Sequence, residues 1–334
     1  MPTTNSGDGP RGPDYVRRVI ASLTWRALSR DDAETSADLL NAIEAVDKIG
    51  ENYTAEDTLT ELVDPYADLE RGSLAAFDGD VMVGYMKIQY RPTASEVHRV
   101  SLDGGVHPTY RRQGIGTRLV QAGIESARVL HALHHPTLRL AINVHKAEHI
   151  SGVPELLGAA GFTPVRYFQR MEHALLNVGL SEDPRIEPWS EATDEEFRRV
   201  RNEAYRENWG STPMPVELWR NKVTNQTFRP SASFLLRDGG GVAAGLLVTM
   251  NWEADTEATG VRDAHFMVIG TLPAYRNRGV ASALLGHALR AAAEQGYDRA
   301  LLSVDSENFT GAFGIFERAG FTSAMRFVRW ALEV

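Results

Sequence analysis

The chain has 334 residues, of which 43% are hydrophobic and 24% charged, and it contains no cysteine. This composition excludes collagen-like, coiled-coil and wholly disordered classes, and the missing cysteines exclude a disulfide scaffold, a thiolate zinc site and a cysteine nucleophile. The net charge of −9 argues against nucleic acid as a partner, because a surface that binds phosphates is basic.

The chain opens on a polar segment rich in glycine and proline, which predicts a disordered tail over residues 1–21 and not a secretory signal. No apolar run reaches the ~18 residues of a membrane helix, so we expect a cytoplasmic protein without a membrane partner. A strand around Trp25 comes next, then an amphipathic helix whose apolar residues recur at helical spacing from Ala33 to Val46. An Asp-Gly pair at Asp78 and Gly79 then predicts a hairpin turn.

Beyond the hairpin we predict a strand over Arg99–Val106, a turn containing glycine, and a long helix over Gly114–Ala132. A buried strand over Leu138–Val144 follows, then a short helix, a Gly-Phe pair at Gly161, and a last strand. This order of strands and helices predicts a mixed α/β or α+β sheet flanked by helices.

The same order recurs in the second half of the chain. Gly84 matches Gly245 in the hairpins, Gly114 matches Gly279 in the turns, and Gly161 matches Gly320 in the Gly-Phe pairs. The corresponding strands and long helix are predicted over His265–Thr271, Ala300–Val304 and Gly279–Gln295. We therefore predict two copies of one fold, an N-terminal domain over residues 22–178 and a C-terminal domain over residues 183–334.

The turn before each long helix carries the chemistry. It reads Arg-Arg-Gln-Gly-Ile-Gly from Arg111 and Arg-Asn-Arg-Gly-Val-Ala from Arg276. A helix N-terminus has unpaired N–H donors, glycine lets the backbone approach a phosphate closely, and arginine adds charge-assisted bonds. No Gly-Lys-Ser/Thr follows the turn, which excludes a Walker loop. A Rossmann dinucleotide-binding loop is not supported either, because no acidic residue ends a second strand at the expected distance.

These features resemble the GNAT superfamily of N-acetyltransferases, over both halves of the chain. The segment from Asp305 to Phe321 is similar to the closing motif of that family. The duplication and the sequence Val268–Pro273 resemble mycothiol synthase-like proteins, which acetylate the amine of a sugar–cysteine conjugate. The resemblance implies acetyl-CoA as cofactor, with its pyrophosphate on the turn and its pantetheine along the strand before it, where one strand amide polarises the thioester carbonyl.

The residues that the resemblance assigns to acetyl-CoA fall in both copies. In the first copy they are Gly104, Gly105, Val106, Arg111, Arg112, Gln113, Gly114, Ile115, Gly116 and Thr117. In the second copy they are Ile269, Gly270, Thr271, Arg276, Asn277, Arg278, Gly279, Val280, Ala281, Ser282 and Asn308.

Acetyl transfer needs a neutral amine, so we expect a base. Alignment on the turns places His265 where tandem relatives carry an acidic base, and an imidazole suits this role near neutral pH. The matching residue of the first copy is Val100, which cannot accept a proton. We therefore expect His265 to be the catalytic base, in the second copy. The first copy is then either a non-catalytic acetyl-CoA site or an empty one. Alternative bases in the second copy are Asp263, Asp305 and Glu307.

One departure from the family concerns the general acid. Many members carry a tyrosine five residues before the closing phenylalanine, and this chain has Phe316 and Leu157 there. For the acceptor, the helix near the start of the second copy offers Glu203 or Glu207 for an ammonium group and Tyr205 or Trp209 for stacking. A run of histidines, His131 to His135, favours a helix-end cluster over a metal site, because a third ligand is not evident.

The expected function is transfer of an acetyl group from acetyl-CoA to a primary amine of a small molecule, such as an amino sugar, a sugar–cysteine conjugate or a cationic antibiotic. Two alternatives stay open: catalysis in the N-terminal or in both domains, and a non-catalytic module that senses acetyl-CoA or binds a partner. The sequence leaves the oligomeric state undetermined.

Overall fold

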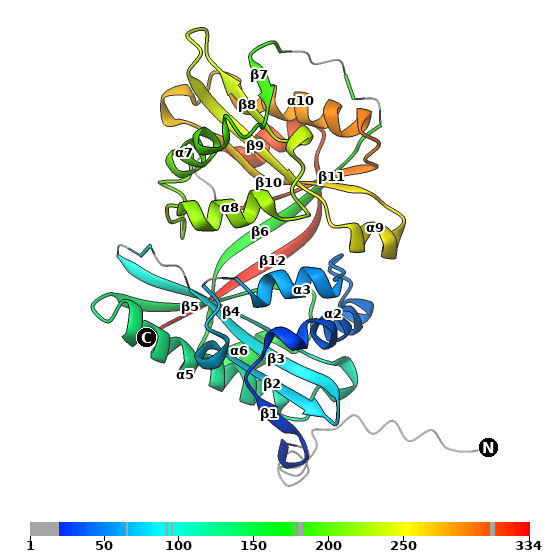
Figure 1. Ribbon diagram of the computed structural model, residues 1–334, viewed down its shortest axis with the longest axis vertical. Coiled ribbons are helices and arrows are strands. Elements are labelled where there is room, and N and C mark those ends of the chain that lie inside the picture. Colours follow the sequence, from blue (N-terminus) through cyan, green and yellow to red (C-terminus); the bar gives the residue numbers. More distant parts are fainter. Residues whose placement is uncertain are drawn as a thin grey trace, which may run out of the picture.

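The computed structural model describes residues 20–334 except 65, 91–92, 95, 177, 180–182 and 308–310. The tail predicted over residues 1–21 therefore lies almost wholly outside the described residues, as does Asn308. Figure 1 shows two halves stacked along the long axis, one built from each copy of the repeat. None of the described helices is long and apolar enough to cross a membrane.

The N-terminal half has strands β1 (Thr24–Arg26), β2 (Ser73–Asp78), β3 (Val81–Tyr90), β4 (Val97–Val106), β5 (Arg139–Ala147) and β6 (Thr163–Ala174). Its helices are α2 (Ala33–Asp47), α3 (Ala55–Leu62), α4 (Leu69–Gly72), α5 (Ile115–His134) and α6 (Val153–Ala159), with short 3-10 helices η1 (Arg30–Asp32) and η2 (Pro108–Tyr110). The predicted order of elements is confirmed, and the strand and helix ends lie within a few residues of the predicted ones.

The C-terminal half repeats this order of strands and of the long helix, with one further helix between its third and fourth strands. Its strands are β7 (Ile186–Pro188), β8 (Phe234–Arg237), β9 (Ala243–Met250), β10 (Asp263–Thr271), β11 (Arg299–Asp305) and β12 (Thr322–Glu333). Its helices are α7 (Asp194–Ala204), α8 (Val216–Thr224), α9 (Glu253–Thr259), α10 (Val280–Glu294) and α11 (Ala312–Arg318), with η3 (Pro230–Ala232) and η4 (Pro273–Tyr275).

The two halves share one sheet, whose order is β1-β2-β3-β4-β5-β12-β6-β11-β10-β9-β8-β7. The last strand of each copy pairs with the fifth strand of the other copy, since β12 lies against β5 and β6 lies against β11. Both strands have 12 residues, and they also pair with each other as they cross between the halves (Figure 1). The C-terminus consequently lies in the half built from the first copy.

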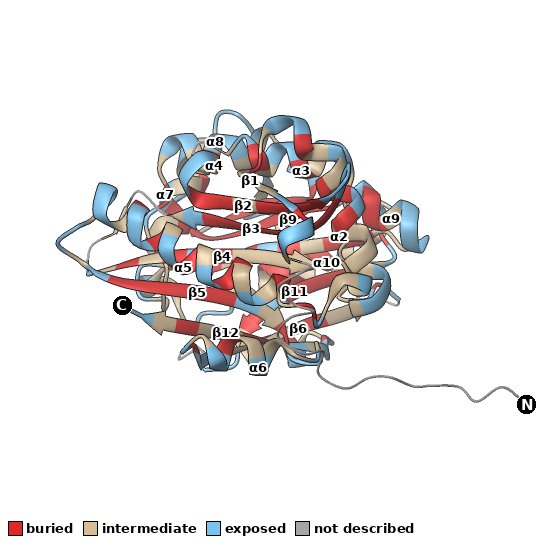
Figure 2. Cartoon of the chain, turned by 90° about the horizontal axis from the view of Figure 1, so that it is seen from below, coloured by how far each residue is buried: buried red, intermediate tan, exposed pale blue. Residues whose placement is uncertain are grey.

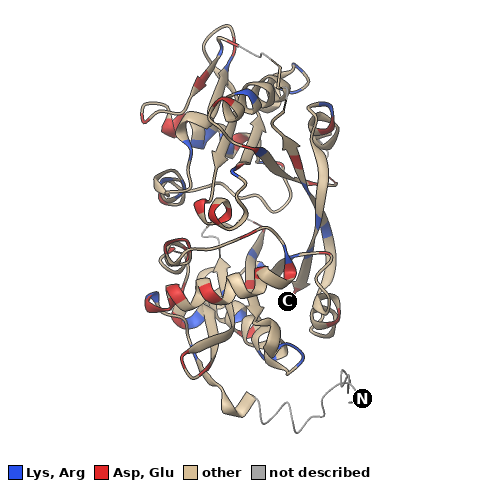
Figure 3. Ribbon diagram, turned by 90° about the vertical axis from the view of Figure 1, so that its right-hand side faces the viewer, with Lys and Arg blue, Asp and Glu red and all other residues tan. Residues whose placement is uncertain are grey.

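Apolar helix faces cover both sides of this sheet. In the N-terminal half α5 covers one face through Leu119, Ala127 and Leu130, while α2 and α3 cover the other through Leu39 and Leu62. In the C-terminal half α10 and α7 take the corresponding positions. Figure 2 shows the buried strands between helices with exposed outer faces, and Figure 3 shows basic and acidic residues distributed over both halves.

In each copy the two central parallel strands separate after a short paired segment. Strand β4 pairs with β5 from Val97 to Ser101 but continues to Val106. Strand β10 pairs with β11 only from Asp263 to His265 and continues to Thr271. The edges of β4 and β10 beyond these points face an opening between the strands, which we call the splay of each copy.

A β-bulge distinguishes β10 from β4. The pairing of β10 with β9 shifts between Phe266 and Val268, whereas β4 pairs with β3 in a continuous register from Val100 to Val106. A bulge adds one residue to a strand, so alignment from the turn is off by one on the far side of it.

This extra residue corrects the predicted match between His265 and Val100. In the second copy His265 pairs with Met250, which lies five residues after Gly245. In the first copy the residue five positions after Gly84 is Gln89, and its partner on β4 is Ser101. His265 therefore corresponds to Ser101. By the same comparison Val268 corresponds to Asp103, so a carboxylate stands on the cofactor strand of the first copy.

Two loops that follow the first helices hold the halves together. The backbone N–H and the side-chain amide of Asn52, from the first copy, both donate to Asp255 Oδ1 on α9, at 2.6 and 3.1 Å. In the reverse direction Trp209 from the second copy lies against the guanidinium groups of Arg99 and Arg166, 4.7 and 5.4 Å from its ring. Each copy therefore covers part of the other, beside the shared strands.

The contact at Asp255 predicts a pH dependence of stability. Burial, together with the charges of Glu51 and Asp263, raises the pKa of Asp255 to about 6 despite the hydrogen bonds from Asn52. Because the pKa is raised in the folded state, the stability linked to it is complete below pH ~4 and is lost as the pH rises through ~6, by up to about 3 kcal/mol. Asp255→Asn, which keeps the acceptor oxygen, removes this loss.

Denaturant unfolding of the wild type and Asp255→Asn at pH 4.5 and pH 8 measures the effect. We expect the variant to gain stability relative to the wild type as the pH rises. A constant difference between the two proteins at both pH values would contradict the assignment.

Candidate active site

The turns before α5 and α10 have the same backbone conformation. Arg112 and Asn277 both have φ of 60°, and Gly114 and Gly279 follow with φ of 83° and 78°. Successive residues in such a turn direct their N–H groups toward a common point, which forms an anion-binding concavity at the helix N-terminus.

Each turn is fixed by a tyrosine in the 3-10 helix before it. Tyr110 donates to Asp78 at 2.7 Å, and Tyr275 donates to Asp238 at 2.7 Å, so the hairpin tip of each copy supports its turn. Gly116 packs against α6, since a Cβ atom there would lie 3.3 Å from the Leu156 side chain, and the second copy has the small residue Ala281 at the matching position. Both turns thus have a backbone conformation that fits the predicted anion sites, and the binding of an anion there stays a prediction.

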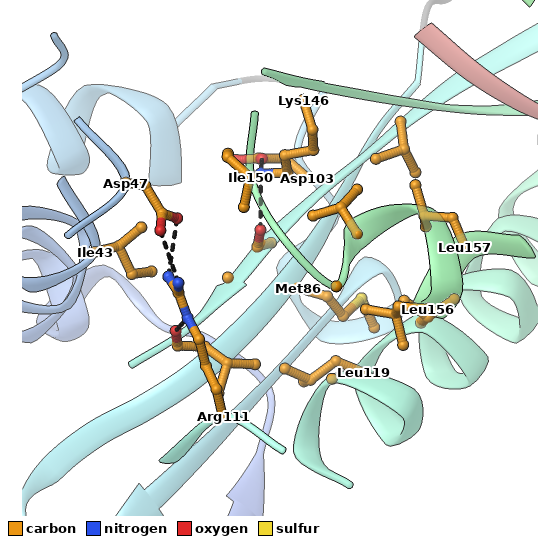
Figure 4. A pocket seen from close by; sticks show the side chains of 18 of the residues that line it. Ile43, Asp47, Met86, Asp103, Arg111, Leu119, Lys146, Ile150, Leu156 and Leu157 are labelled. Atoms are coloured by element: carbon orange, nitrogen blue, oxygen red, sulfur yellow. Dashed lines mark hydrogen bonds and ion pairs between the residues drawn. The ribbon is translucent and has the colours of Figure 1, made fainter. Parts of the chain in front are cut away.

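A cavity of about 390 Å³ opens from the turn of the first copy into its splay. Leu102, Val144 and Leu156 contribute apolar surface to it, and the turn and the edge of β4 contribute polar backbone (Figure 4). Its volume is in the range typical of small-molecule sites. Of the residues assigned to the cofactor, the lining includes Gly104, Gly105, Val106, Arg111, Arg112, Gly114, Gly116 and Thr117.

Two other residues assigned to this turn have side chains directed elsewhere. Gln113 is buried and donates to the carbonyl oxygen of Thr109 at 3.0 Å. Ile115 is packed in the core beneath α5. Their expected contribution is therefore limited to backbone N–H groups, whereas Arg111 and Arg112 present side chains to the cavity.

The Arg111 guanidinium is already paired on the α2 side of the cavity. Its two terminal nitrogens donate to the carboxylate of Asp47 at 2.7 and 2.8 Å, and its Nε donates to the carbonyl oxygen of Val106 at 3.1 Å (Figure 4). A bidentate pair of this kind holds the guanidinium in one orientation. Arg111 therefore joins the end of α2, the edge of β4 and the turn.

The inner part of the cavity carries a charged cluster around Asp103. Lys146 Nζ lies 3.2 Å from Asp103 Oδ1 and donates to the carbonyl oxygen of Gly104 at 2.9 Å, while Tyr85 donates to Asp103 Oδ2 at 2.9 Å. Burial acts to raise the pKa of Asp103, but the charges of Lys146 and Lys87 and the hydrogen bond from Tyr85 outweigh it and lower the pKa. Asp103 is therefore a carboxylate at neutral pH.

The wall of the cavity toward the other half comes from both copies. Tyr53 donates to Glu51 at 3.1 Å, and Glu51 accepts from Arg170 of β6 at 2.8 Å. Phe327 of β12, which belongs to the second copy, stacks on His145 with ring centroids 5.2 Å apart. The strand exchange thus brings a residue of the second copy into the site of the first.

In the second copy the splay holds a side chain of the same copy. Tyr205, at the end of α7, accepts from Ile269 N at 3.1 Å and donates to Ile269 O at 3.1 Å. A Cβ atom on Gly270 would lie 2.9 Å from Ala204, so α7 is in close contact with the strand. Arg276 of the turn donates to Glu207 at 2.7 Å.

His265, the expected base, lies at the start of the splay in the second copy. Its ring is perpendicular to that of Trp252, with centroids 4.9 Å apart, and its Nε2 atom is buried without a hydrogen-bond partner. Burial lowers the pKa of His265 to about 4, assisted by Arg170 and Arg299 and opposed by Asp263. The imidazole is therefore neutral at pH 7, as a proton acceptor must be, although its basicity is low.

The three residues expected to bind the acceptor do not share one cleft. Glu203 forms an ion pair with Arg206 at 3.1 Å on the helix surface. Tyr205 lies in the splay, and Trp209 lies between Arg99 and Arg166 at the contact between the halves. Their role toward an acceptor stays a prediction.

The remaining motifs have structural surroundings. Phe316 and Leu157 are buried in the two cores. Helix-end histidine His131 faces His98 with Nδ1 atoms 3.1 Å apart, and burial followed by the charges of neighbouring histidines lowers the pKa of His98 to about 4. Among the described residues no three His, Asp or Glu side chains are arranged to hold a metal ion.

Sequence reasoning missed the cluster of Asp103, Lys146, Tyr85 and Tyr53. One signal was available: Asp103 directly precedes the Gly-Gly pair of the cofactor strand, and alternation along the strand places it on the face that α2 covers. Lys146 and Tyr53 come from elements far apart in the sequence, and no local pattern brings them together.

Comparison with known proteins agrees with this geometry. The model of the acetyltransferase (GNAT) family matches residues 40–148 and 194–321. The chain belongs to this family. It is an acyltransferase that takes its acetyl group from acetyl-CoA, built from two GNAT regions.

Individual relatives cover nearly the whole chain. Mycothiol acetyltransferases from Salinispora arenicola and Mycolicibacterium paratuberculosis are 27% and 26% identical, over 91% of this chain and 94% and 96% of theirs. A crystal structure of a GCN5-related N-acetyltransferase from Sphaerobacter thermophilus has a TM-score of 0.71 at 24% identity, covering 93% of this chain and 96% of its own. A tandem GNAT protein from the clavulanic acid biosynthesis pathway has a TM-score of 0.67 at 15% identity, covering 93% and 98%.

The surroundings of His265 make a prediction for its titration. Because burial disfavours the imidazolium, we expect the ring to stay neutral at pH 5.5 and to titrate near pH 4. NMR of the histidine side chains, with His265→Gln to assign the signal, measures the midpoint. A midpoint near 6.5 would show that the ring is solvated and would contradict the described packing.

Proposed function

We propose that the chain transfers the acetyl group of acetyl-CoA to a primary amine of a small molecule, and that the transfer takes place in the N-terminal copy. The observation that carries this proposal is the cavity of about 390 Å³, which joins the anion-binding turn to the charged cluster at Asp103. Acetyl-CoA supplies the activated acetyl thioester.

The backbone of the first copy fits such a donor. His107 N donates to Val83 O, so in this antiparallel pair the residues that face the splay are Val106 and Gly104. The turn at Arg112 and Gly114 offers N–H groups to a pyrophosphate, and Val106 offers its N–H to a carbonyl oxygen of the pantetheine arm. The N–H of Gly104 points into the splay, where it can polarise a thioester carbonyl.

The charged cluster supplies the remaining groups for the reaction. The amine nitrogen bonds to the acetyl carbon, the C–S bond breaks, the amine loses a proton and the sulfur of CoA gains one. Lys146 Nζ donates a hydrogen bond to the carbonyl oxygen of Gly104, and from this position it stabilises negative charge on the departing sulfur. The Asp103 carboxylate orients Lys146 and attracts the ammonium form of the acceptor, which releases one proton to solvent before the neutral nitrogen attacks.

The acceptor class rests on the relatives. The mycothiol acetyltransferases match along almost the whole length of both chains. The inner cavity of this chain combines carboxylates at Glu51 and Asp103 with aromatic rings at Tyr53 and Phe327, which suits a small polar amine.

Catalysis in the C-terminal copy is the second candidate. The bulge in β10 follows directly after its last pair with β11, and His265 lies beside it with a neutral ring. Substitutions that affect one copy at a time distinguish the two candidates.

The first test measures turnover with a panel of amino sugars, cysteinyl amines and aminoglycosides. For acceptors without a thiol, release of CoA is followed with a thiol reagent, to which the chain contributes no signal because it has no cysteine. For the cysteinyl amines, the acetylated product is measured by chromatography. We expect at least one small amine to be acetylated. If acetyl-CoA binds but the whole panel gives no turnover, the chain acts as a binding module.

The second test compares Asp103→Asn with His265→Gln on the best amine. We expect Asp103→Asn to lower kcat/KM by roughly 10²-fold, a size typical of losing one positioned charged group, with acetyl-CoA affinity changed less than threefold. His265→Gln is expected to stay near the wild type. The opposite result would assign catalysis to the C-terminal copy, and Asp80→Asn in the exposed hairpin turn controls for surface charge.

A further inference from the structure

The two copies have the same turn but differ in what the splay contains. In the first copy a cavity extends from the turn along β4. In the second copy the corresponding edge of β10 is occupied by the Tyr205 side chain. This difference bears on how many acetyl-CoA molecules the chain binds.

The pairing of β10 shows where Tyr205 lies. Leu272 N donates to Ala244 O, so residues alternate from there and Ile269 directs its N–H and C=O away from β9 and into the splay. The backbone of Ile269 is the counterpart of Gly104. The Tyr205 hydroxyl forms hydrogen bonds with both the N–H and the C=O of Ile269. Its oxygen therefore lies where the carbonyl oxygen of a ligand would accept a hydrogen bond from the strand.

The closed arrangement is stable for a physical reason. Strand β11 has separated from β10 at this point, so the N–H and C=O of Ile269 would otherwise lack partners in a half-buried position. A phenol hydroxyl supplies a donor and an acceptor at once. Arg276, the first arginine of the turn, is engaged by Glu207 two residues after Tyr205, so the same loop covers both the strand edge and the turn.

The sequence explains why only the second copy is closed. The residue that matches Tyr205 in the first copy is Glu44, and α2 continues past it to Asp47, whereas α7 ends at Ala204. The Glu44 carboxylate accepts from the N–H groups of Ile49 and Gly50, at 2.9 and 2.8 Å. It therefore points toward the following loop, and the splay of the first copy stays open.

We propose that Tyr205 occupies the acetyl-CoA groove of the C-terminal copy, so that the chain binds one acetyl-CoA, in the N-terminal copy. Tyr205 determines which of the two duplicated sites accepts the cofactor. The second copy then contributes to the site of the first copy through β12, which pairs with β5 and places Phe327 in the lining of the cavity.

The test counts acetyl-CoA sites by isothermal titration calorimetry on the full chain, without an amine. The matched pair Gly114→Asp and Gly279→Asp places a carboxylate in each turn at a left-handed position, which aspartate tolerates better than most residues. We expect one equivalent bound by the wild type, at least tenfold weaker binding in Gly114→Asp, and unchanged binding in Gly279→Asp. Two equivalents in the wild type, or weaker binding in Gly279→Asp, would overturn the proposal.

A second experiment opens the closed groove. Tyr205→Ala removes the ring and both hydrogen bonds, and we expect it to add a second equivalent that is lost again in the Tyr205→Ala, Gly279→Asp double variant. One equivalent in a Tyr205→Ala protein with an unchanged circular dichroism spectrum would reject Tyr205 as the closing group. Since binding is measured without turnover, the outcome is independent of the proposed acetyl transfer.

Discussion

The exchange of the last strands is the constraint on which the rest of the structure depends. Strand β12 pairs with β5 and strand β6 pairs with β11, so each half is completed by hydrogen bonds from the other. The same exchange carries Phe327 into the first cavity and Arg170 to Glu51 at its wall. The site of the first copy is therefore a product of the whole chain.

Duplication has preserved the conformation of the turn before the long helix and changed what surrounds it. The left-handed pair at Arg112 and Gly114 recurs at Asn277 and Gly279. The end of the first helix differs, because α7 stops one turn earlier than α2 and leaves Tyr205 at its end. A change in helix length thus accounts for one open splay and one occupied splay beside turns of the same conformation.

Local signals in the sequence were sufficient for the fold of each copy and for both turns, because helical spacing, Asp-Gly hairpins and glycine at left-handed positions are short-range features. They were insufficient for the strand exchange, since β5 lies near the middle of the chain and β12 at its end, and the pattern of either last strand also fits pairing within its own copy. The bulge at Phe266 was also invisible, and it moved the counterpart of His265 from Val100 to Ser101. Asp103 and Lys146 meet only through tertiary packing.

The exchanged strand also has a consequence for synthesis on the ribosome. Strand β5 pairs with β4 on one side, but its neighbour on the other side, β12, ends at Glu333 and is made last. A nascent first copy therefore exposes the unpaired edge of β5 while the second copy is translated.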